Sequence, residues 1–147
     1  RGLQADDIPK VTAGEGNIII RALSGEWAGT MGVFKSFANV SLATLAFRPG
    51  GAWSIDIPAE ENIFFYVVRG SLTVNSTPVR MRQLLEFENA GETVAMSAKD
   101  DSLIILGHAK PLNEPVVAQG PFVMNTREEI MQAYRDYEEG KFGSWNE

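Results

Sequence analysis

The stretch that decides the fold is FRPGGAWSIDIPAEENIFFYVVRGSLTV, residues 47–74. After the turn Pro49–Gly51, apolar residues alternate at Trp53, Ile55 and Ile57, and an apolar run then covers Ile63–Val68. Alternation at every second residue is typical of a half-buried strand, whereas Pro and Gly mark turns. The stretch therefore predicts two strands on either side of the acidic turn Glu60–Glu61, arranged much like a hairpin.

The rest of the chain repeats this pattern of short strands and turns. Further strands are predicted at residues 17–24, 40–47, 72–74, 79–81, 83–87, 93–96 and 103–107. Strands at intervals of about 8–12 residues favour an all-β sandwich or barrel over a parallel sheet with crossover helices.

The two ends of the chain differ from this middle part. Residues 1–16 have little apolar periodicity and are predicted to be a linker, residues 17–110 a β-barrel, and residues 111–147 an extended tail and helix of the same domain. Thr126 followed by Glu129 is a capping box, and Ile130 and Ala133 continue at helical spacing. One C-terminal α-helix is expected.

Composition limits the classes of function. The 147 residues include 13 Lys and Arg against 19 Asp and Glu, a formal net charge of −6, and no cysteine. Disulfides and thiolate chemistry are excluded, and direct binding of nucleic acid is disfavoured because it depends on clustered positive charge. No apolar run reaches the roughly 18 residues of a membrane span, and no signal-peptide core is visible. We expect a soluble, intracellular, cytoplasmic chain.

The stretch LNEPVVAQGPFVMNT, residues 112–126, resembles the carboxy-terminal signature of pirins and pirin-like proteins. Residues 7–11 (DIPKV), 65–70 (FYVVRG) and 140–143 (GKFG) fit the same family, so the resemblance covers almost the whole chain. It implies a cupin barrel, which is a jelly-roll or double-stranded β-helix, with one C-terminal α-helix.

The resemblance also implies a larger parent protein. Pirins are bicupins with two stacked barrels, in which the amino-terminal barrel binds iron through three histidines and a glutamate and the carboxy-terminal barrel usually has no metal. This chain resembles only the carboxy-terminal half, so we expect a fragment whose partner is the absent N-terminal cupin domain. Quercetin 2,3-dioxygenase activity and transcriptional co-regulation are implied for the parent, and a protein partner or a homodimer is possible for this half.

The metal-binding motif of the cupins has no counterpart in this sequence. Residues 57–62 contain no histidine, Ile63 stands where the glutamate belongs, and residues 98–101 lack the histidine of the second motif. One histidine cannot make a three-histidine site. We therefore predict no metal, no cofactor and no catalytic residue in this chain, with iron in the absent domain.

His108 is the single imidazole. It follows an apolar run and is either a base or hydrogen-bond donor at the barrel mouth or a hydrogen-bonded residue at a strand end, and the second interpretation is favoured because no orienting partner is visible. Glu60 and Glu61 are either an acid–base pair or a solvated turn, and the turn is favoured.

Aromatic residues offer a further candidate site. Trp53, Phe64, Phe65 and Tyr66 either line a pocket for an aromatic ligand or fill the core, and core packing is favoured. A barrel pocket would be formed by Trp53, Ile55, Tyr66 and His108. Trp27, Phe142 and Trp145 are predicted surface anchors for the missing half, and Asn113 and Glu114 are predicted to hydrogen-bond backbone in the tail.

These observations lead to three hypotheses about the function of the chain. The first is a metal-free cupin domain that supports the parent protein and binds partners without chemistry of its own. The alternative is metal-independent binding of an aromatic small molecule, such as a flavonoid, inside the barrel. The third and weakest is self-association through the surface that the absent barrel would cover.

Overall fold

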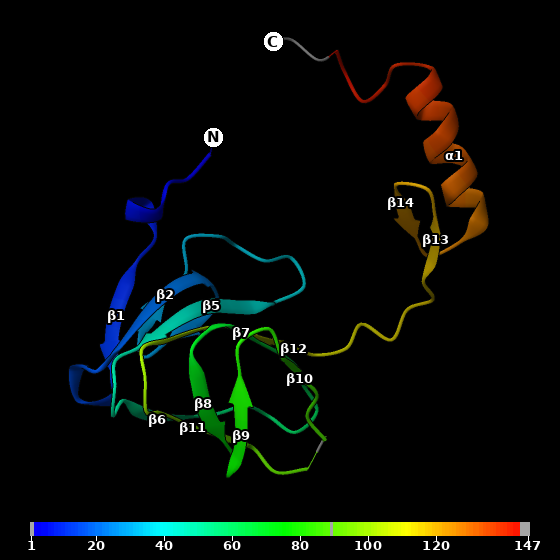
Figure 1. The fold of residues 1–147 in the computed structure, drawn as a ribbon. Coiled ribbons are helices and arrows are strands. Elements are labelled where there is room, and N and C mark those ends of the chain that lie inside the picture. Colours follow the sequence, from blue (N-terminus) through cyan, green and yellow to red (C-terminus); the bar gives the residue numbers. More distant parts are fainter. Residues whose placement is uncertain (1, 89, 145–147) are drawn as a thin grey trace. The chain divides into compact units, whose positions relative to one another are not determined.

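The computed structural model describes residues 2–88 and 90–144 of the chain. They form two compact units, a barrel unit (Arg1–Pro111) and a tail unit (Leu112–Glu147). Figure 1 shows the strands of the first unit and the single α-helix of the second. The sequence places the tail at residues 111–147, and the tail unit of the structure begins at Leu112. None of the described helices is long and apolar enough to cross a membrane.

The larger sheet of the barrel unit has six strands in the order β1-β2-β5-β12-β7-β10, and neighbouring strands are antiparallel. Its strands are β1 (Lys10–Ala13), β2 (Ile18–Ser24), β5 (Ser41–Phe47), β7 (Asn62–Arg69), β10 (Leu84–Leu85) and β12 (Ser102–Ala109). Because β1 belongs to this sheet, the first 16 residues are not simply a linker. The sequence does not indicate β1, since KVTA is short and half polar.

The smaller sheet has four antiparallel strands in the order β6-β11-β8-β9. They are β6 (Ala52–Asp56), β8 (Ser71–Val74), β9 (Thr77–Arg80) and β11 (Thr93–Ala98). The turn between β8 and β9 consists of Asn75 and Ser76, both with positive φ. Thr77 and Pro78 therefore belong to β9, whereas the sequence predicts that this strand begins at residue 79. Two short 3-10 helices, η1 (Ala5–Asp7) and η2 (Gly14–Gly16), flank β1, and β3 (Glu26–Trp27) pairs with β4 (Thr30–Met31).

The two strands predicted on either side of the acidic turn are present as β6 and β7, but they do not form a hairpin. β6 pairs with β11, whereas β7 pairs with β12 and β10. The acidic turn before β7 therefore crosses from the smaller sheet to the larger one. This crossing brings the two sheets together.

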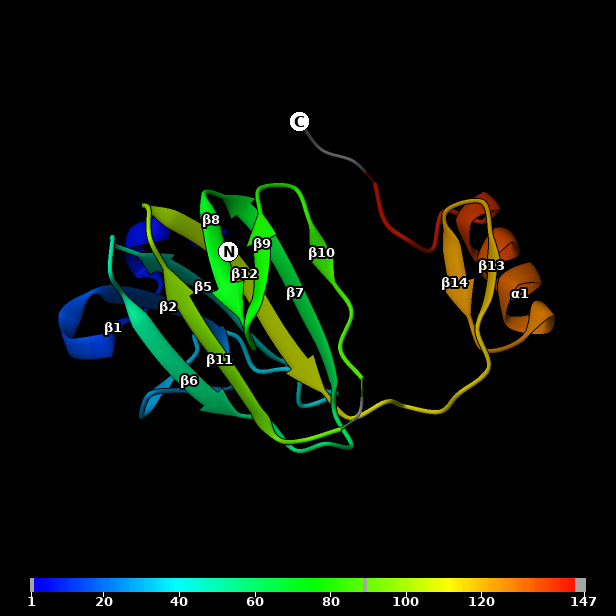
Figure 2. The same cartoon turned by 60° about the horizontal axis from the view of Figure 1, so that its bottom comes forward.

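The core lies between the two sheets, which face each other in Figure 2. Strand residues alternate between this core and the outside because successive side chains point to opposite faces. The buried hydrophobic residues of this core are Ile18, Ile20, Ala22, Trp27, Ala43, Leu45, Phe47, Ile57, Phe65, Val67, Leu72, Val74, Val79, Val94, Met96, Ala98, Ile104 and Leu106. The prediction of an all-β fold with one C-terminal helix is confirmed.

The tail unit contains a short hairpin and the helix. β13 (Val117–Gln119) pairs with β14 (Phe122–Met124), and α1 (Arg127–Glu138) follows. The predicted capping box is present, because Thr126 Oγ1 accepts from the Glu129 N–H at 3.2 Å and the Glu129 carboxylate accepts from the Thr126 N–H at 2.9 Å. Ile130 and Ala133 are buried, and the rings of Phe122 and Tyr134 pack edge to face at 4.9 Å.

Candidate functional site

His108 lies on β12 and points to the same side of the sheet as Ile104 and Leu106, which are fully buried. Its antiparallel partner on β7 is Ile63. Glu61 lies two residues before Ile63, immediately before the first residue of β7, and its Oε2 lies 2.6 Å from His108 Nδ1. Strand pairing thus brings the single histidine onto a carboxylate 47 residues away.

Both members of this pair are largely shielded from water, with side-chain exposures of 15% for His108 and 17% for Glu61. Glu60 differs, since its ion pair with Lys110 is 3.7 Å long and both side chains are exposed. The prediction of a solvated acidic turn therefore holds for Glu60 and is wrong for Glu61. The orienting partner of His108, which the sequence does not reveal, is this carboxylate.

Trp27 completes the cluster at this end of the barrel. Its indole is fully buried, donates a hydrogen bond from Nε1 to the Ser24 carbonyl at 2.9 Å, and meets the His108 ring edge to face at 5.6 Å. The prediction of a surface anchor is therefore wrong for Trp27. Phe142, the second predicted anchor, is exposed in the tail unit and packs against Phe122 of the same unit. Trp145, the third, lies outside the described residues.

The tail signature is stabilised by side chains as well as backbone. Glu114 Oε2 accepts a hydrogen bond from Asn125 Nδ2 at 3.1 Å, and the same amide nitrogen donates to the Pro115 carbonyl at 2.8 Å. Glu114 therefore bonds a side chain, whereas backbone partners are predicted. Asn113 adopts a positive φ of 54°.

The donor set of the barrel does not fit an iron ion. Among the described residues no group of three or more His, Cys, Asp or Glu side chains is close enough to hold a metal. His108 and Glu61 supply one imidazole and one carboxylate, and these are already bonded to each other. A first-row metal in a site of this kind needs more ligands than that. What the pair can do is fix the orientation of the His108 ring against Trp27.

The four residues of the predicted barrel pocket do not come together. Trp53 and Ile55 on β6 pack against the core, and His108 faces the same interior from the other sheet. Tyr66 pairs with Ile105 of β12 and lies between the buried Phe65 and Val67, so it points away from the core. Binding of an aromatic ligand stays a prediction.

Comparisons with known proteins place the chain in a family. The sequence profile described as the Pirin C-terminal cupin domain matches residues 42–143. A pirin-like protein of Solanum lycopersicum is 35% identical over 93% of the chain and 48% of its own length. A putative quercetin 2,3-dioxygenase of Pseudomonas aeruginosa is 29% identical over 92% of the chain and 48% of its own length.

A solved structure agrees with these sequence matches. A quercetin 2,3-dioxygenase from Acinetobacter baumannii superposes with a TM-score of 0.87 at 29% identity and covers 97% of the chain and 50% of its own. The chain thus spans about half the length of the curated relatives named above. The cupin jelly-roll prediction is confirmed.

Proposed function

Because the chain belongs to the pirin family, as a pirin carboxy-terminal cupin domain, we propose that it is the metal-free, structural half of a two-barrel protein. In this proposal its role is to support the other barrel and to bind partners. The proposal rests on the apolar outward face of the six-stranded sheet. The coverage of about half of each curated relative agrees with it.

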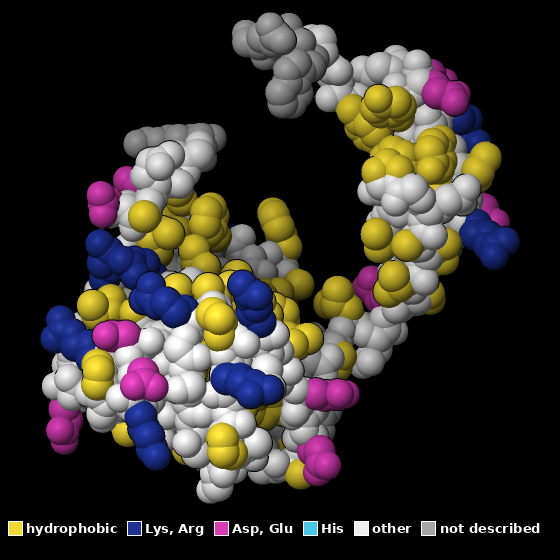
Figure 3. Space-filling view, viewed as in Figure 1, with side chains coloured by type: hydrophobic (Ala, Val, Ile, Leu, Met, Phe, Trp, Pro, Cys, Tyr) yellow, Lys and Arg dark blue, Asp and Glu magenta, His cyan; other side chains and the backbone are white. Residues whose placement is uncertain are grey.

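The outward face is defined by residues whose strand neighbours point into the core. It consists of Ile19 on β2, Leu42, Thr44 and Ala46 on β5, Leu103 and Ile105 on β12, Phe64 and Tyr66 on β7, and Leu84 on β10. All of these but Thr44 are hydrophobic, and the charged Arg21 of β2, which pairs with Thr44, lies on the same face. Phe64 and Leu84 are 48% and 63% exposed, and hydrophobic side chains gather over the upper part of this unit in Figure 3. Contiguous exposed patches of this kind mark interaction surfaces.

Further exposed hydrophobic residues extend the apolar surface of the unit. They are Met31 of β4 and, in the loop after it, Val33, Phe34 and Phe37, of which Phe37 is fully exposed. A polar side chain also belongs to the outward face. Arg21 pairs with Thr44, and its Nε is buried without a hydrogen-bond partner among the described residues. A guanidinium has donors only, so a carboxylate on the covering partner would satisfy it.

The occupant we propose is the other barrel of the parent protein. Strands of a sheet with both faces covered contain continuous apolar runs, and β12 (Leu103–Leu106) and β2 (Ile18–Ile20) contain such runs. Iron and quercetin 2,3-dioxygenase chemistry, or transcriptional co-regulation, would then belong to the parent as a whole. No step of that chemistry is assigned to residues of this chain.

Two measurements test this proposal. Elemental analysis of the purified chain is expected to find no stoichiometric iron, and one tightly held iron per chain would refute the metal-free assignment. In the full-length parent, Ile105→Asp is expected to lower the thermal midpoint because it puts a charge into the covered face. Thr73→Asp, at an outward position of the four-stranded sheet, is the matched control and should change the midpoint little. Equal effects would contradict the covering role.

A further inference from the structure

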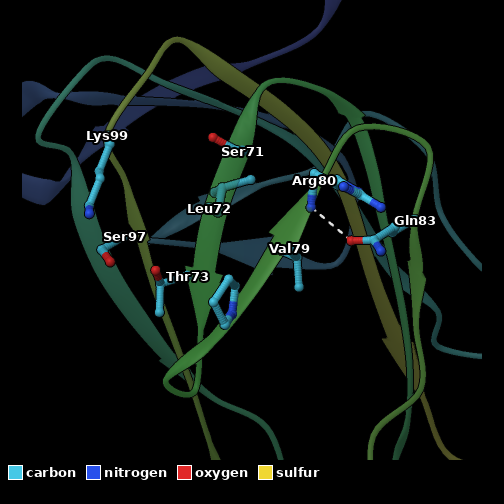
Figure 4. Close-up of a pocket in the computed structure, with 9 residues that line it drawn as sticks. Ser71, Leu72, Thr73, Val79, Arg80, Gln83, Ser97 and Lys99 are labelled. Atoms are coloured by element: carbon cyan, nitrogen blue, oxygen red, sulfur yellow. Dashed lines mark hydrogen bonds between the residues drawn. The ribbon is translucent and has the colours of Figure 1, made fainter.

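The outward face of the four-stranded sheet contains a groove of about 440 Å³. Figure 4 shows it across β8, β9 and β11. The lining residues are Ser71, Leu72, Thr73, Pro78, Val79, Arg80, Gln83, Ser97 and Lys99. Its volume lies in the range of about 300–1,000 Å³ that is typical of small-molecule sites.

Hydroxyl groups form the middle of this groove. Leu72 and Val74 of β8 are buried, so Ser71 and Thr73 point outward. Ser97 of β11 pairs with Thr73 and shares its face. The sheet therefore holds hydroxyls on adjacent strands at neighbouring positions, where each can donate and accept hydrogen bonds.

Cationic side chains stand on opposite sides of the groove. In Figure 4, Lys99 lies on one side and Arg80 on the other, with Ser71 and Thr73 between them. Gln83, which also lines the groove, accepts a hydrogen bond at its Oε1 from the Arg80 backbone N–H at 2.8 Å. The lining contains no Asp or Glu, although acidic residues outnumber basic ones in the chain by 19 to 13.

One carboxylate lies close to the groove without lining it. Asp100 Oδ2 accepts a hydrogen bond from Ser71 Oγ at 3.2 Å. The hydroxyls of Thr73 and Ser97 have no such partner within the part of the chain that the structure describes. Asp100 therefore occupies one hydroxyl and leaves the other two available.

We propose that this groove binds a small polyhydroxylated anion with a phosphate group at each end, of the sugar bisphosphate class. Arg80 presents a planar fork of donors that fits a phosphate, and Lys99 presents a point charge. The hydroxyls of Thr73 and Ser97 pair with the hydroxyls of the sugar. The site is exposed, so its charge contribution is screened by salt. It does not rest on the role proposed for the six-stranded sheet, because it lies on the other sheet.

The test titrates the chain with three probes at low ionic strength, followed by the backbone amide signals of Ser71, Thr73 and Ser97 in NMR spectra. The probes are fructose 1,6-bisphosphate, fructose 6-phosphate and fructose. The bisphosphate is expected to bind about tenfold more tightly than the monophosphate, which corresponds to about 1.4 kcal/mol for the second charged contact. Fructose is expected to leave the spectrum unchanged.

Variants make the test specific to the groove. Lys99→Gln and Arg80→Gln are each expected to weaken bisphosphate binding about tenfold, because each removes one charged contact. Lys110→Gln is the matched control, since Lys110 is an exposed lysine outside the groove that pairs with Glu60. Asp100→Asn should strengthen binding, because it removes the nearby negative charge. The side chains of Arg80, Lys99 and Asp100 are exposed, so these substitutions are expected to preserve the fold.

Three outcomes would overturn the proposal. Equal binding of fructose and its bisphosphate would show that the charges play no part. A loss of affinity in Lys110→Gln as large as that in Lys99→Gln would show general attraction to the surface. Weaker binding in Asp100→Asn would show that the carboxylate assists binding, which contradicts a site that attracts the bisphosphate by its charge.

Discussion

The outward faces of the two sheets differ in chemistry although both belong to one barrel. On the six-stranded sheet, outward positions such as Leu42, Tyr66 and Ile105 are hydrophobic and half-buried. On the four-stranded sheet, outward positions such as Thr73 and Ser97 are small and polar. One face has the character of an interface, and the other has the character of a surface that stays in water.

The sequences of the strands account for this difference. β11 has the sequence TVAMSA and alternates between exposed and buried residues, as expected for a strand with one wet face. β12 has the sequence SLIILGHA, and none of its residues is exposed. An uninterrupted apolar strand is typical of a sheet covered on both sides. The comparison therefore predicts where a partner binds, and the following substitutions test it.

The largest loss of stability is expected when a core-facing residue of β12 is truncated. The preceding residue of the same strand faces outward and is the comparison. Leu106→Ala removes a fully buried side chain and should cost about 2–5 kcal/mol of unfolding free energy in the isolated chain. Ile105→Ala, one residue earlier and facing outward, should cost much less. Chemical denaturation of both variants measures the difference. Equal losses would mean that the outward face of β12 is already part of a core.

A smaller loss is expected at the end of the barrel. Glu61→Gln replaces the carboxylate that bonds His108 at 2.6 Å, and hydrogen bonds to charged groups contribute about 1.5–3 kcal/mol. Denaturation followed by tryptophan fluorescence should show a loss of this size. The matched control is Glu60→Gln, whose ion pair is exposed and contributes about 0–1 kcal/mol. An unchanged Glu61→Gln variant would show that the pair does not order the barrel end.

Substitutions at the most exposed apolar positions should barely alter the stability of the isolated chain. Phe64→Ser and Leu84→Ser are expected to change the unfolding free energy by no more than about 0.5 kcal/mol, as usual for surface sites. Sedimentation should show less self-association if copies of the chain associate through this face. A wild-type chain that stays monomeric at high concentration would rule out a homodimer through it.

The smallest effect belongs to the tail unit and provides a reference for a solvated contact. A hydrogen bond from Lys141 at 2.8 Å lowers the pKa of Asp136 below 3.8, and a second from Gln132 acts in the same direction. Because the folded-state pKa is lowered, any stability from this contact is present above the ordinary value and is lost as the pH falls. Lys141→Met should raise the pKa of Asp136 toward 3.8 in an NMR titration. An unchanged pKa would refute the contact.

Much of the secondary structure could be predicted from the sequence, because each strand is bounded by turn residues. Which strands pair could not, since β7 pairs with β12, and these strands are far apart in the chain. For the same reason Glu61 could not be recognised as the partner of His108. The short polar strand β1 gave no periodic signal, and Trp27 lies among glycines that indicate only a loop.

The direction in which Tyr66 points illustrates a different limit. Residues 63–68 are apolar at every position, so periodicity does not distinguish the inward from the outward side. The pairing of Tyr66 with Ile105 settles it. The ambiguity is itself informative, because it arises where the outward face is as hydrophobic as the core. A pocket formed by Trp53, Ile55, Tyr66 and His108 would require the Tyr66 side chain to point inward. The apolar run of residues 63–68 does not show which of its side chains point inward.

The most direct test of the covered face uses the absence of cysteine from the chain. Single cysteines at Phe64 of the six-stranded sheet and Ser97 of the four-stranded sheet, F64C and S97C, report accessibility through their rate of reaction with a thiol reagent. In the isolated chain both should react readily, because both positions are exposed. In the full-length parent, F64C should be protected while S97C keeps its rate. Equal reactivity of the two cysteines in the full-length protein would contradict the account.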